Sequence, residues 1–331
     1  MHHRLCNECT IGGAYWNRVE ATVSAIGPTL FCIAEKLGGG CTMFDRAKYA
    51  FILPAFLVVL IIGLFPLIYS LTISFMQVRL VPPMPPSFVG FDNYAEALSQ
   101  PRFWSSVRVT FLIATLAVAA QYILGLALAL ALNSSLPLGR VYRAAFLFPL
   151  LMAPIAVAFI GKMIFHPGVG PMRDLFGLFG YPNPPFQTDP VWATGMLVTI
   201  EVWQWTSLVV IILLAGLQSL PRDVYEAAEL ENATRWQQFW GITFPMLLPI
   251  SAAVVFLRFV ESLKLIDTVF VLTGGGPGIA TETLTLYTYQ EGFKKFNLGY
   301  TSAISFLFLI LIVIFGTVYV ALIKPQLEKR T

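Results

Sequence analysis

Six long runs of apolar residues constrain this chain more than any other feature of its sequence. A helix of about 20 apolar residues crosses the hydrocarbon core of a bilayer, because each residue adds about 1.5 Å along the helix axis. A closed β-barrel would show short strands of alternating polarity instead. The sequence therefore predicts an all-α integral membrane protein with six transmembrane helices, over residues 50–74, 107–132, 141–165, 191–217, 244–263 and 302–323.

The composition agrees with a bilayer as the solvent. Hydrophobic residues make up 57% of the chain and charged residues 12%, whereas a soluble domain carries about 25% charged residues. The net charge of +3 is small, and the sequence has no basic cluster with interleaved aromatic residues. These features exclude nucleic acid as a partner and make the lipid bilayer the first expected partner of the chain.

The first 42 residues differ in composition from the rest of the chain. All four cysteines lie there, at Cys6, Cys9, Cys32 and Cys41. A structural zinc site needs a second ligand pair at a recognisable spacing, and the last two cysteines do not supply one for the C-x-x-C pair. Met43 has the character of a natural start. We therefore expect no metal site, and we expect residues 1–42 to be an extension without a function.

The distribution of Lys and Arg favours termini that face the cytoplasm, because cytosolic loops carry an excess of these residues. With six spans both termini lie on one side of the membrane. If that side is the cytosol, the inner segments hold Arg46, Lys48, Arg140, Arg143, Arg222, Arg235, Lys324, Lys329 and Arg330. The outer loops, which occupy much more sequence, then hold Arg79, Arg102, Arg173, Lys264, Lys294 and Lys295.

The predicted outer loops contain clusters of turn-forming residues, at 81–86, 181–185 and 274–278. Proline fixes φ and lacks a donor, and glycine accepts positive φ, so each cluster predicts an irregular loop. Two interpretations remain open for these loops. They form a surface for a partner, or they only connect the spans.

A polar segment between the fourth and fifth spans has a strong helical pattern. Leu220, Val224 and Ala227 follow the spacing of one helix face, and Pro221 suits a first turn. Asn232 is the best non-glycine residue for a left-handed turn. Thr234 and Gln237 then form a capping box that starts a second helix. We predict a helix, a tight turn and a helix that leads into the fifth span, although an ordinary interfacial loop would share some of these features.

This segment resembles the EAA loop of the permeases of binding-protein-dependent ABC importers. The family pattern reads Glu-Ala-Ala, three residues, Gly, nine residues and Ile-x-Leu-Pro. The matching residues are Glu226, Ala227, Ala228, Asn232, Ile242, Phe244 and Pro245. Asn232 replaces the glycine and can still adopt the turn, and Phe244 keeps its position apolar.

A second group of motifs is similar to the carbohydrate-uptake branch of those permeases. It consists of residues 272–277, the sequence Thr281-Glu282-Thr283 and residues 299–303. The resemblance covers the chain from about Tyr49 to the C-terminus. Together the two groups of motifs are specific to the family, whereas either alone would only be suggestive.

The resemblance implies the fold of a six-transmembrane-helix ABC type I importer permease in the bacterial cell (inner) membrane. Residues 43–104 would hold the first transmembrane helix and an outer loop. Residues 105–323 would form the transmembrane core, with the EAA loop at 219–245, and residues 324–331 a cytosolic tail. The residues that would couple the chain to an ATPase are Glu226, Ala227, Ala228, Glu229, Asn232 and Pro245.

The chain lacks an ATP site of its own, because no G-x-x-x-x-G-K-[ST] loop is present. The resemblance implies separate ATPase subunits that bind ATP and Mg²⁺, a second permease subunit of different sequence, and an extracytoplasmic solute-binding protein. We expect no cofactor on this chain, no catalytic residue and no enzymatic activity. The expected function is to form half of an alternating-access pathway for a sugar, sugar alcohol or related polyol derivative.

Polar residues within the spans are the candidates for this pathway, since a charge at mid-bilayer costs about 2.5–3.5 kcal/mol. A sugar offers hydroxyls to carboxylates and amides, and an apolar ring face to indole. The candidates are Glu201, Trp203, Gln204, Arg258 and Glu261. In the alternative interpretation Arg258 and Glu261 neutralise each other and Glu201 lies near the outer headgroups. For Gln121 we expect an interhelical hydrogen bond.

An ion-coupled secondary transporter of a small polar solute is the alternative function, because intramembrane charges could carry a proton. The chain has no internal hydropathy repeat of the kind found in many such transporters. The sequence does not identify the transported solute.

Overall fold

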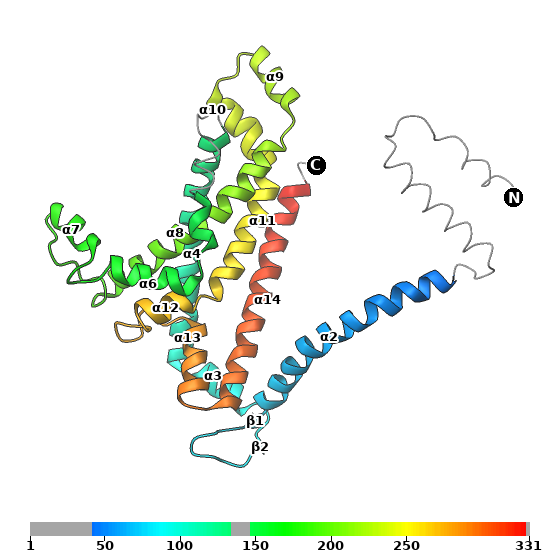
Figure 1. Cartoon of the computed structure of the whole chain (residues 1–331), viewed down its shortest axis with the longest axis vertical. Helices are drawn as coiled ribbons and strands as arrows, with labels where there is room; N and C mark the ends of the chain where they lie inside the picture. The colour runs from blue at the N-terminus through cyan, green and yellow to red at the C-terminus, as the bar shows by residue number, and fades with distance from the viewer. Residues whose placement is uncertain (1–41, 134–145, 329–331) are drawn as a thin grey trace, which may run out of the picture. The chain divides into compact units, whose positions relative to one another are not determined.

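The computed structural model describes residues 42–133 and 146–328 (Figure 1). The predicted extension over residues 1–42 lies almost wholly outside the described residues. The chain divides into two units after Tyr69. The described part of the first unit belongs to helix α2, which covers Thr42–Ser74 and contains Pro54 and Pro66.

From Ser70 onward the described chain is mostly helical. Its long helices are α4 (Pro101–Asn133), α8 (Pro190–Gln218), α11 (Phe244–Leu263) and α14 (Leu298–Glu328). Shorter helices are α3 (Asp92–Ser99), α6 (Pro154–Ile164), α7 (Pro171–Leu178), α9 (Arg222–Leu230), α10 (Arg235–Gln238), α12 (Asp267–Leu272) and α13 (Leu284–Tyr289). A 3₁₀ segment, η2 (Phe148–Leu151), and two π-helical segments, η3 (Phe239–Thr243) and η4 (Gln290–Lys294), complete the helical part.

A small antiparallel hairpin precedes α3. Strand β1 (Met76–Gln77) pairs with β2 (Ser87–Phe88), with Met76 opposite Phe88. The chain after β1 also contacts the start of α14, because Leu298 donates its backbone N–H to the Val78 carbonyl (2.9 Å). The hairpin therefore ties the beginning of the second unit to the beginning of its last helix.

Five helices among the described residues are long and apolar enough to cross a membrane. They cover Phe56–Ser74, Pro101–Asn133, Pro190–Gln218, Arg235–Leu263 and Leu298–Pro325. The fourth of these continues through α10, η3 and α11. These helices confirm the prediction of a helical, multi-span membrane protein.

The third predicted span, over residues 141–165, differs from the other five. Residues 134–145 lie outside the described part, and the remainder consists of η2 and α6 with a break between them. Pro154, the first residue of α6, explains the break, because proline cannot donate to the helix ladder and disfavours helical geometry in the preceding residue. Ala153 is accordingly extended, with ψ of 135°. A continuous apolar composition therefore concealed an interruption of the helix.

Helices α4 and α8 approach each other closely at Gly125. A Cβ atom added there would lie 2.6 Å from Val209 Cγ1. The apolar cluster beside this contact includes Ala129, Val210 and Leu213, all buried. Small residues at such a crossing let two helix backbones approach closely.

The two ends of the second unit carry different structures (Figure 1). Helices α9 and α10 project at one end, where α8 finishes and the helix leading into α11 starts. Helices α3 and α13 lie at the opposite end with the β1–β2 hairpin. The long helices connect these two ends.

The Gly125 contact yields a stability prediction. We expect Gly125→Ala to lower the free energy of unfolding by about 1–3 kcal/mol, because the new methyl group overlaps Val209. Gly195→Ala is the matched control, since a Cβ at that position on α8 meets nothing within 4 Å. Thermal unfolding of the purified protein in detergent compares the two variants. Equal melting temperatures would show that the α4–α8 crossing tolerates the extra atom.

Candidate functional site

The polar segment between α8 and α11 forms the predicted helix, turn and helix. Helix α9 begins directly after Pro221 and none of its residues is buried. Glu226, Ala227 and Glu229 are exposed, and Ala228 is half-buried. The helix thus presents most of its surface, including the carboxylates of Asp223, Glu226 and Glu229, away from the rest of the chain.

The turn after α9 has the predicted geometry. Asn232 has φ of 57°, in the left-handed region, and its backbone N–H donates to the Glu229 carbonyl (3.0 Å). Thr234 then starts α10 with a capping box. Its backbone N–H donates to Gln237 Oε1 (2.8 Å), and Gln237 N–H donates back to Thr234 Oγ1 (3.4 Å). Both turn residues therefore act as the sequence predicted.

Helix α9 is joined to the start of α11 by a hydrogen bond between side chains. Tyr225 and Thr243 have their hydroxyl oxygens 2.9 Å apart. The aromatic rings on this side pack against one another at centroid distances of 5.1–6.3 Å, and they belong to Trp236, Phe239, Trp240 and Phe244. Pro245 lies in the first turn of α11. Helix α9 is therefore attached to the start of α11 by side-chain contacts, and it also follows α8 directly in the chain.

A polar pocket of about 280 Å³ lies between α8, α11 and the segment that follows α11. Its lining residues are Pro154, Glu201, Gln204, Trp205, Arg258, Glu261, Lys264, Leu265, Ile266, Asp267 and Thr268. Four of the five predicted pathway residues are in this set. They come from two spans far apart in the sequence, so the fold brings the predicted group together.

Arg258 lines the pocket and is only 1% exposed. Its Nη2 donates to Glu201 Oε1 (2.9 Å), and its Nε donates to Gln121 Oε1 (3.0 Å). The guanidinium also lies 4.4 Å from the centroid of the Trp205 ring. Gln121 in turn donates from Nε2 to the Glu201 carbonyl (3.1 Å). The interhelical role expected of Gln121 is present, and one arginine links α4, α8 and α11.

This pairing differs from the self-neutralising pair that the sequence offered as an alternative. Glu261 accepts a hydrogen bond from Lys264 (2.9 Å), and both side chains are about half exposed. Glu201 is 2% exposed and serves as the partner of Arg258. The buried charge of Arg258 is therefore matched between spans, whereas the half-exposed Glu261 is paired locally with Lys264.

Trp203 was predicted to line the path, but it lies outside the pocket. Trp205 lines the pocket instead. Trp203 is 42% exposed. Positions 201, 204 and 205 share one helix face, whereas a residue two positions from Glu201 points away from that face. The helical period of α8 would have identified Trp205.

Three buried polar atoms near Arg258 have no hydrogen-bond partner among the described residues. They are Glu201 Oε2, Gln204 Oε1 and Ser262 Oγ. Two of them belong to residues that line the pocket. Unpartnered buried polar atoms are rare in folded proteins and are satisfied by water or by a ligand. The pocket thus offers two acceptors to a molecule that brings hydroxyl donors.

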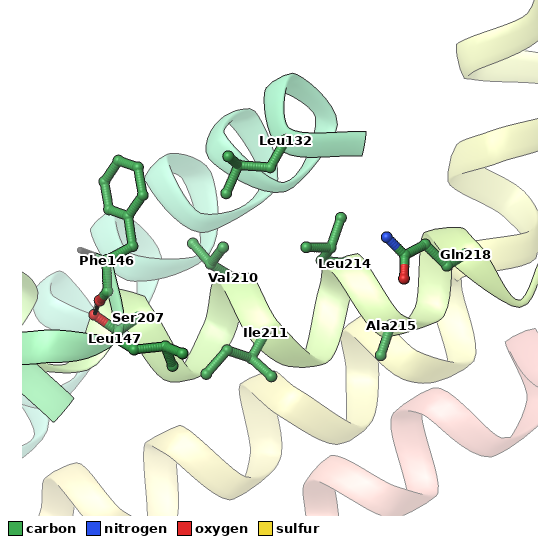
Figure 2. A pocket seen from close by; sticks show the side chains of 9 residues that line it. All are labelled: Leu132, Phe146, Leu147, Ser207, Val210, Ile211, Leu214, Ala215 and Gln218. Carbon is green, nitrogen blue, oxygen red and sulfur yellow. Dashed lines mark hydrogen bonds between the residues drawn. The ribbon is translucent and has the colours of Figure 1, made fainter. Parts of the chain in front are cut away.

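A second pocket, of about 240 Å³, is apolar and lies beside α8 nearer α9 (Figure 2). Leu132, Val210 and Leu214 contribute to its lining, and the Ser207 hydroxyl donates to the Phe146 carbonyl at its edge. It presents few polar groups to a ligand. The polar pocket is therefore the better candidate for binding a hydroxylated solute.

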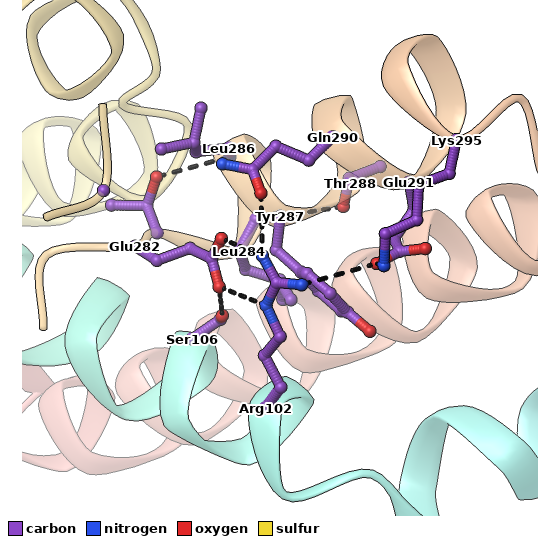
Figure 3. Close-up of polar contacts among 12 residues, drawn as sticks. Arg102, Ser106, Glu282, Leu284, Leu286, Tyr287, Thr288, Gln290, Glu291 and Lys295 are labelled. Carbon is purple, nitrogen blue, oxygen red and sulfur yellow. Dashed lines mark hydrogen bonds and ion pairs between the residues drawn. The ribbon is translucent and has the colours of Figure 1, made fainter. Parts of the chain in front are cut away.

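The structure also shows a charged cluster that the sequence analysis missed. Arg102 at the start of α4 pairs with Glu282, which lies 180 positions away in the chain (Figure 3). Glu282 belongs to the Thr281-Glu282-Thr283 motif of the sequence analysis. Arg102 was predicted only to be one of the cations of the outer loops. Within the described residues, no group of three or more His, Cys, Asp or Glu side chains is arranged to hold a metal ion.

The Arg258–Glu201 pair yields a second prediction. We expect Arg258→Gln to destabilise the protein by about 3–5 kcal/mol, because it leaves the Glu201 carboxylate buried without its cation. The double variant Arg258→Gln with Glu201→Gln removes both charges and should recover most of that loss. Melting temperatures of the two single variants and the double variant measure the coupling. Additive effects of the two single substitutions would contradict a direct pair.

Comparison with known proteins identifies the family. The family model described as "Binding-protein-dependent transport system inner membrane component" matches residues 93–330. This range includes α9, the polar pocket and the Arg102 cluster. It leaves out only the first helix, the β-hairpin and the N-terminal segment.

Individual relatives agree with this match. The chain is 35% identical to a trehalose/maltose transport system permease protein, MalF, of Thermococcus litoralis over 83% of this chain and 92% of the relative. It is 30% identical to a sulfoquinovosyl glycerol transport system permease protein, SmoG, of Agrobacterium fabrum, covering 82% and 89%. It is also 30% identical to a trehalose transport system permease protein, SugA, of Mycobacterium tuberculosis, covering 83% and 86%.

A solved structure has the same fold. A chain in the crystal structure of a bacterial alginate ABC transporter, in complex with an alginate pentasaccharide-bound periplasmic protein, superposes with a TM-score of 0.76. The match covers 86% of this chain and 96% of the other, at 19% sequence identity. The chain therefore belongs to the inner membrane components of binding-protein-dependent transport systems, the permeases of ABC importers.

Proposed function

We propose that this chain is the permease subunit of an ATP-driven importer for a sugar, sugar alcohol or related polyol derivative. It forms half of an alternating-access pathway across a bacterial inner membrane. The named relatives are permeases of transport systems for trehalose, maltose and sulfoquinovosyl glycerol, which supports this class of solute. The structural observation that carries the proposal is the polar pocket at Arg258.

The chemistry of the pocket suits a polyol. Glu201 Oε2 and Gln204 Oε1 can each accept a hydrogen bond from a sugar hydroxyl, and both lack a partner among the described residues. Trp205 offers apolar surface to the C–H groups of a sugar ring. The volume of about 280 Å³ is near the lower limit of typical small-molecule pockets, which is about 300 Å³. The path in this proposal includes Glu201, Gln204, Trp205, Arg258 and Glu261.

Separate partner proteins supply the remaining functions. ATPase subunits bind ATP and Mg²⁺ and dock on α9, and an extracytoplasmic binding protein delivers the solute. A second permease subunit, of different sequence, completes the pathway. In this arrangement α9 faces the cytoplasm, both termini are cytoplasmic, and the chain itself hydrolyses no ATP.

The connections of α9 support its coupling role. It links the end of α8 to the helix that leads into α11, and the same two helices carry Glu201 and Arg258. Glu201 lies about 25 Å along α8 from its last residue, at about 1.5 Å per residue. A rigid displacement of α9 would therefore act on both walls of the pocket. The exposed residues Glu226 and Glu229 would contact the ATPase, while Asn232 and Pro245 fix the turn and its junction with α11.

The domain boundaries follow from the same proposal. Residues 43–104 hold the first span and an outer loop, and residues 105–323 hold the transmembrane core. Residues 219–245 form the coupling loop, and residues 324–331 form a cytosolic tail. The family match from residue 93 supports a core that begins near α3 and α4.

Substitutions on α9 test the docking role. We expect Glu226→Ala or Ala227→Trp to reduce uptake at least tenfold in the reconstituted transporter, while ATP hydrolysis persists. Both side chains are exposed, so neither change disturbs packing within this chain. Glu231→Ala is the control, because this exposed carboxylate lies just beyond the helix. Normal coupling of hydrolysis to uptake in the Ala227→Trp variant would rule out a docked α9.

Two tryptophans on one helix test the sugar path. Trp205→Ala should lower uptake of the transported sugar by up to about tenfold, because the loss of an aromatic contact costs up to about 1.5 kcal/mol. Trp203→Ala removes an indole of the same size from outside the pocket, and uptake should change less than twofold. The assay uses proteoliposomes that contain the complete transporter and a panel of labelled mono- and disaccharides. A larger defect for Trp203→Ala would move the path to the other face of α8.

A further inference from the structure

The Arg102 cluster lies at the end of the bundle opposite α9, and the proposed path does not use it. Arg102 Nε donates to Glu282 Oε2 (2.8 Å), and Nη2 donates to Glu282 Oε1 (2.6 Å). The same Nη2 donates to Gln290 Oε1 (2.7 Å) (Figure 3). A guanidinium that holds a carboxylate through two N–H groups fixes its position as well as its charge.

Two buried carboxylates face two cations in this cluster. Glu282 is 1% exposed and Glu291 is 5% exposed. Glu291 Oε1 lies 3.8 Å from Arg102 Nη1 and accepts a hydrogen bond from Lys295 Nζ (2.6 Å). The Arg102 side chain is itself 32% exposed. Loss of Arg102 would leave Glu282 buried without a cation, which is costly.

Arg102 also contacts an aromatic ring on α13, the helix between Glu282 and Glu291. The Arg102 guanidinium lies 5.0 Å from the centroid of the Tyr287 ring, within the range of a cation–π interaction. Burial raises the pKa of Tyr287, which moves its ionisation still further above physiological pH than that of an exposed tyrosine. Its hydroxyl oxygen lies 3.0 Å from that of Tyr300 at the start of α14.

The residues after Glu282 connect this cluster to the polar pocket. Thr283 and Thr285 both donate their hydroxyls to the Leu265 carbonyl, at 3.1 and 2.8 Å. Leu265 lines the pocket together with the residues that follow it. On the other side, Leu284 donates its backbone N–H to Thr110 Oγ1 on α4 (2.8 Å). The segment 282–285 is therefore held between α4 and the pocket wall.

We propose that Arg102 is a positioning residue that fixes residues 264–268, the wall of the pocket formed after α11. Arg102 binds Glu282, the adjacent threonines bind Leu265, and the wall keeps its place opposite Glu201. The effect on transport rests on the proposed function, whereas the effect on the wall does not. The residue touches no solute, so its influence on uptake is transmitted through the wall.

Hydrogen exchange in the complete transporter tests the position of the wall. The peptide over residues 263–272 contains the amides of Leu265 and Phe270, which are bonded to the carbonyls of Ser262 and Ile266. We expect Arg102→Gln to accelerate exchange in this peptide about tenfold, as in local opening. A peptide over residues 209–217 of α8 should exchange as in the unsubstituted protein.

Two further variants separate positioning from general stability. Arg108→Gln makes the same substitution at an exposed residue of the same helix, and it should leave the 263–272 peptide unchanged. Arg102→Lys keeps the charge but loses the two-pronged contact, so it should restore part of the protection. If Arg102→Gln does not assemble, the double variant with Glu282→Gln removes both charges and is measured instead. Unchanged exchange at residues 263–272 in the assembled Arg102→Gln or double variant would overturn the proposal.

Uptake kinetics give a second measurement in the same preparation. We expect Arg102→Gln to raise the sugar concentration for half-maximal uptake about fivefold, with ATP hydrolysis unchanged, because only the pocket wall is displaced. A fall in ATP hydrolysis with no change in that concentration would contradict positioning at the pocket. If the unsubstituted transporter takes up none of the labelled sugars, the proposed function fails, and the exchange measurement still decides the role of Arg102.

Discussion

The burial of Arg258 is the interaction on which the bundle depends. A guanidinium out of water is costly unless its donors meet acceptors and its charge meets a carboxylate. Those partners come from different helices, because Gln121 lies on α4 and Glu201 on α8. The arginine thereby fixes how far each helix is shifted along its neighbours. The close α4–α8 contact at Gly125 is one turn beyond Gln121 and shares that fixed register.

The same pair also connects the candidate pocket to the end of the bundle. Helices α8 and α11, which carry Glu201 and Arg258, are the two long helices flanking α9. In the proposed coupling, a displacement of α9 would act on both members of the pair, because a helix backbone is stiff along its axis. The hydrogen bond between Tyr225 and Thr243 adds a direct contact between α9 and the helix leading into α11. The pair and α9 are therefore connected both along the chain and through this side-chain hydrogen bond.

Local features of this fold could be predicted from the sequence, and features that depend on distant contacts could not. Asn232 and the Thr234 capping box depend on residues within a few positions, and both were predicted correctly. The partner of Arg258 was not predictable in the same way, because Glu261 is a near neighbour and Glu201 lies 57 positions away. The Arg102 cluster is a similar case. Trp203 is close to Glu201 in the sequence, but the helical period of α8 places Trp205 in the pocket.

Residues 264–268, the pocket wall after α11, are connected both to α11 and to the Arg102 cluster. They begin directly after Leu263, the last residue of α11, so their start moves with the helix that α9 adjoins. The Leu265 carbonyl is held by Thr283 and Thr285. The residues beside these threonines, Glu282 and Leu284, are held against α4 by Arg102 and Thr110. The wall is thus tethered to α11 on one side and, through residues 282–285, to α4 on the other. Because Arg258 joins these two helices directly, the geometry of the pocket is tied to their relative position.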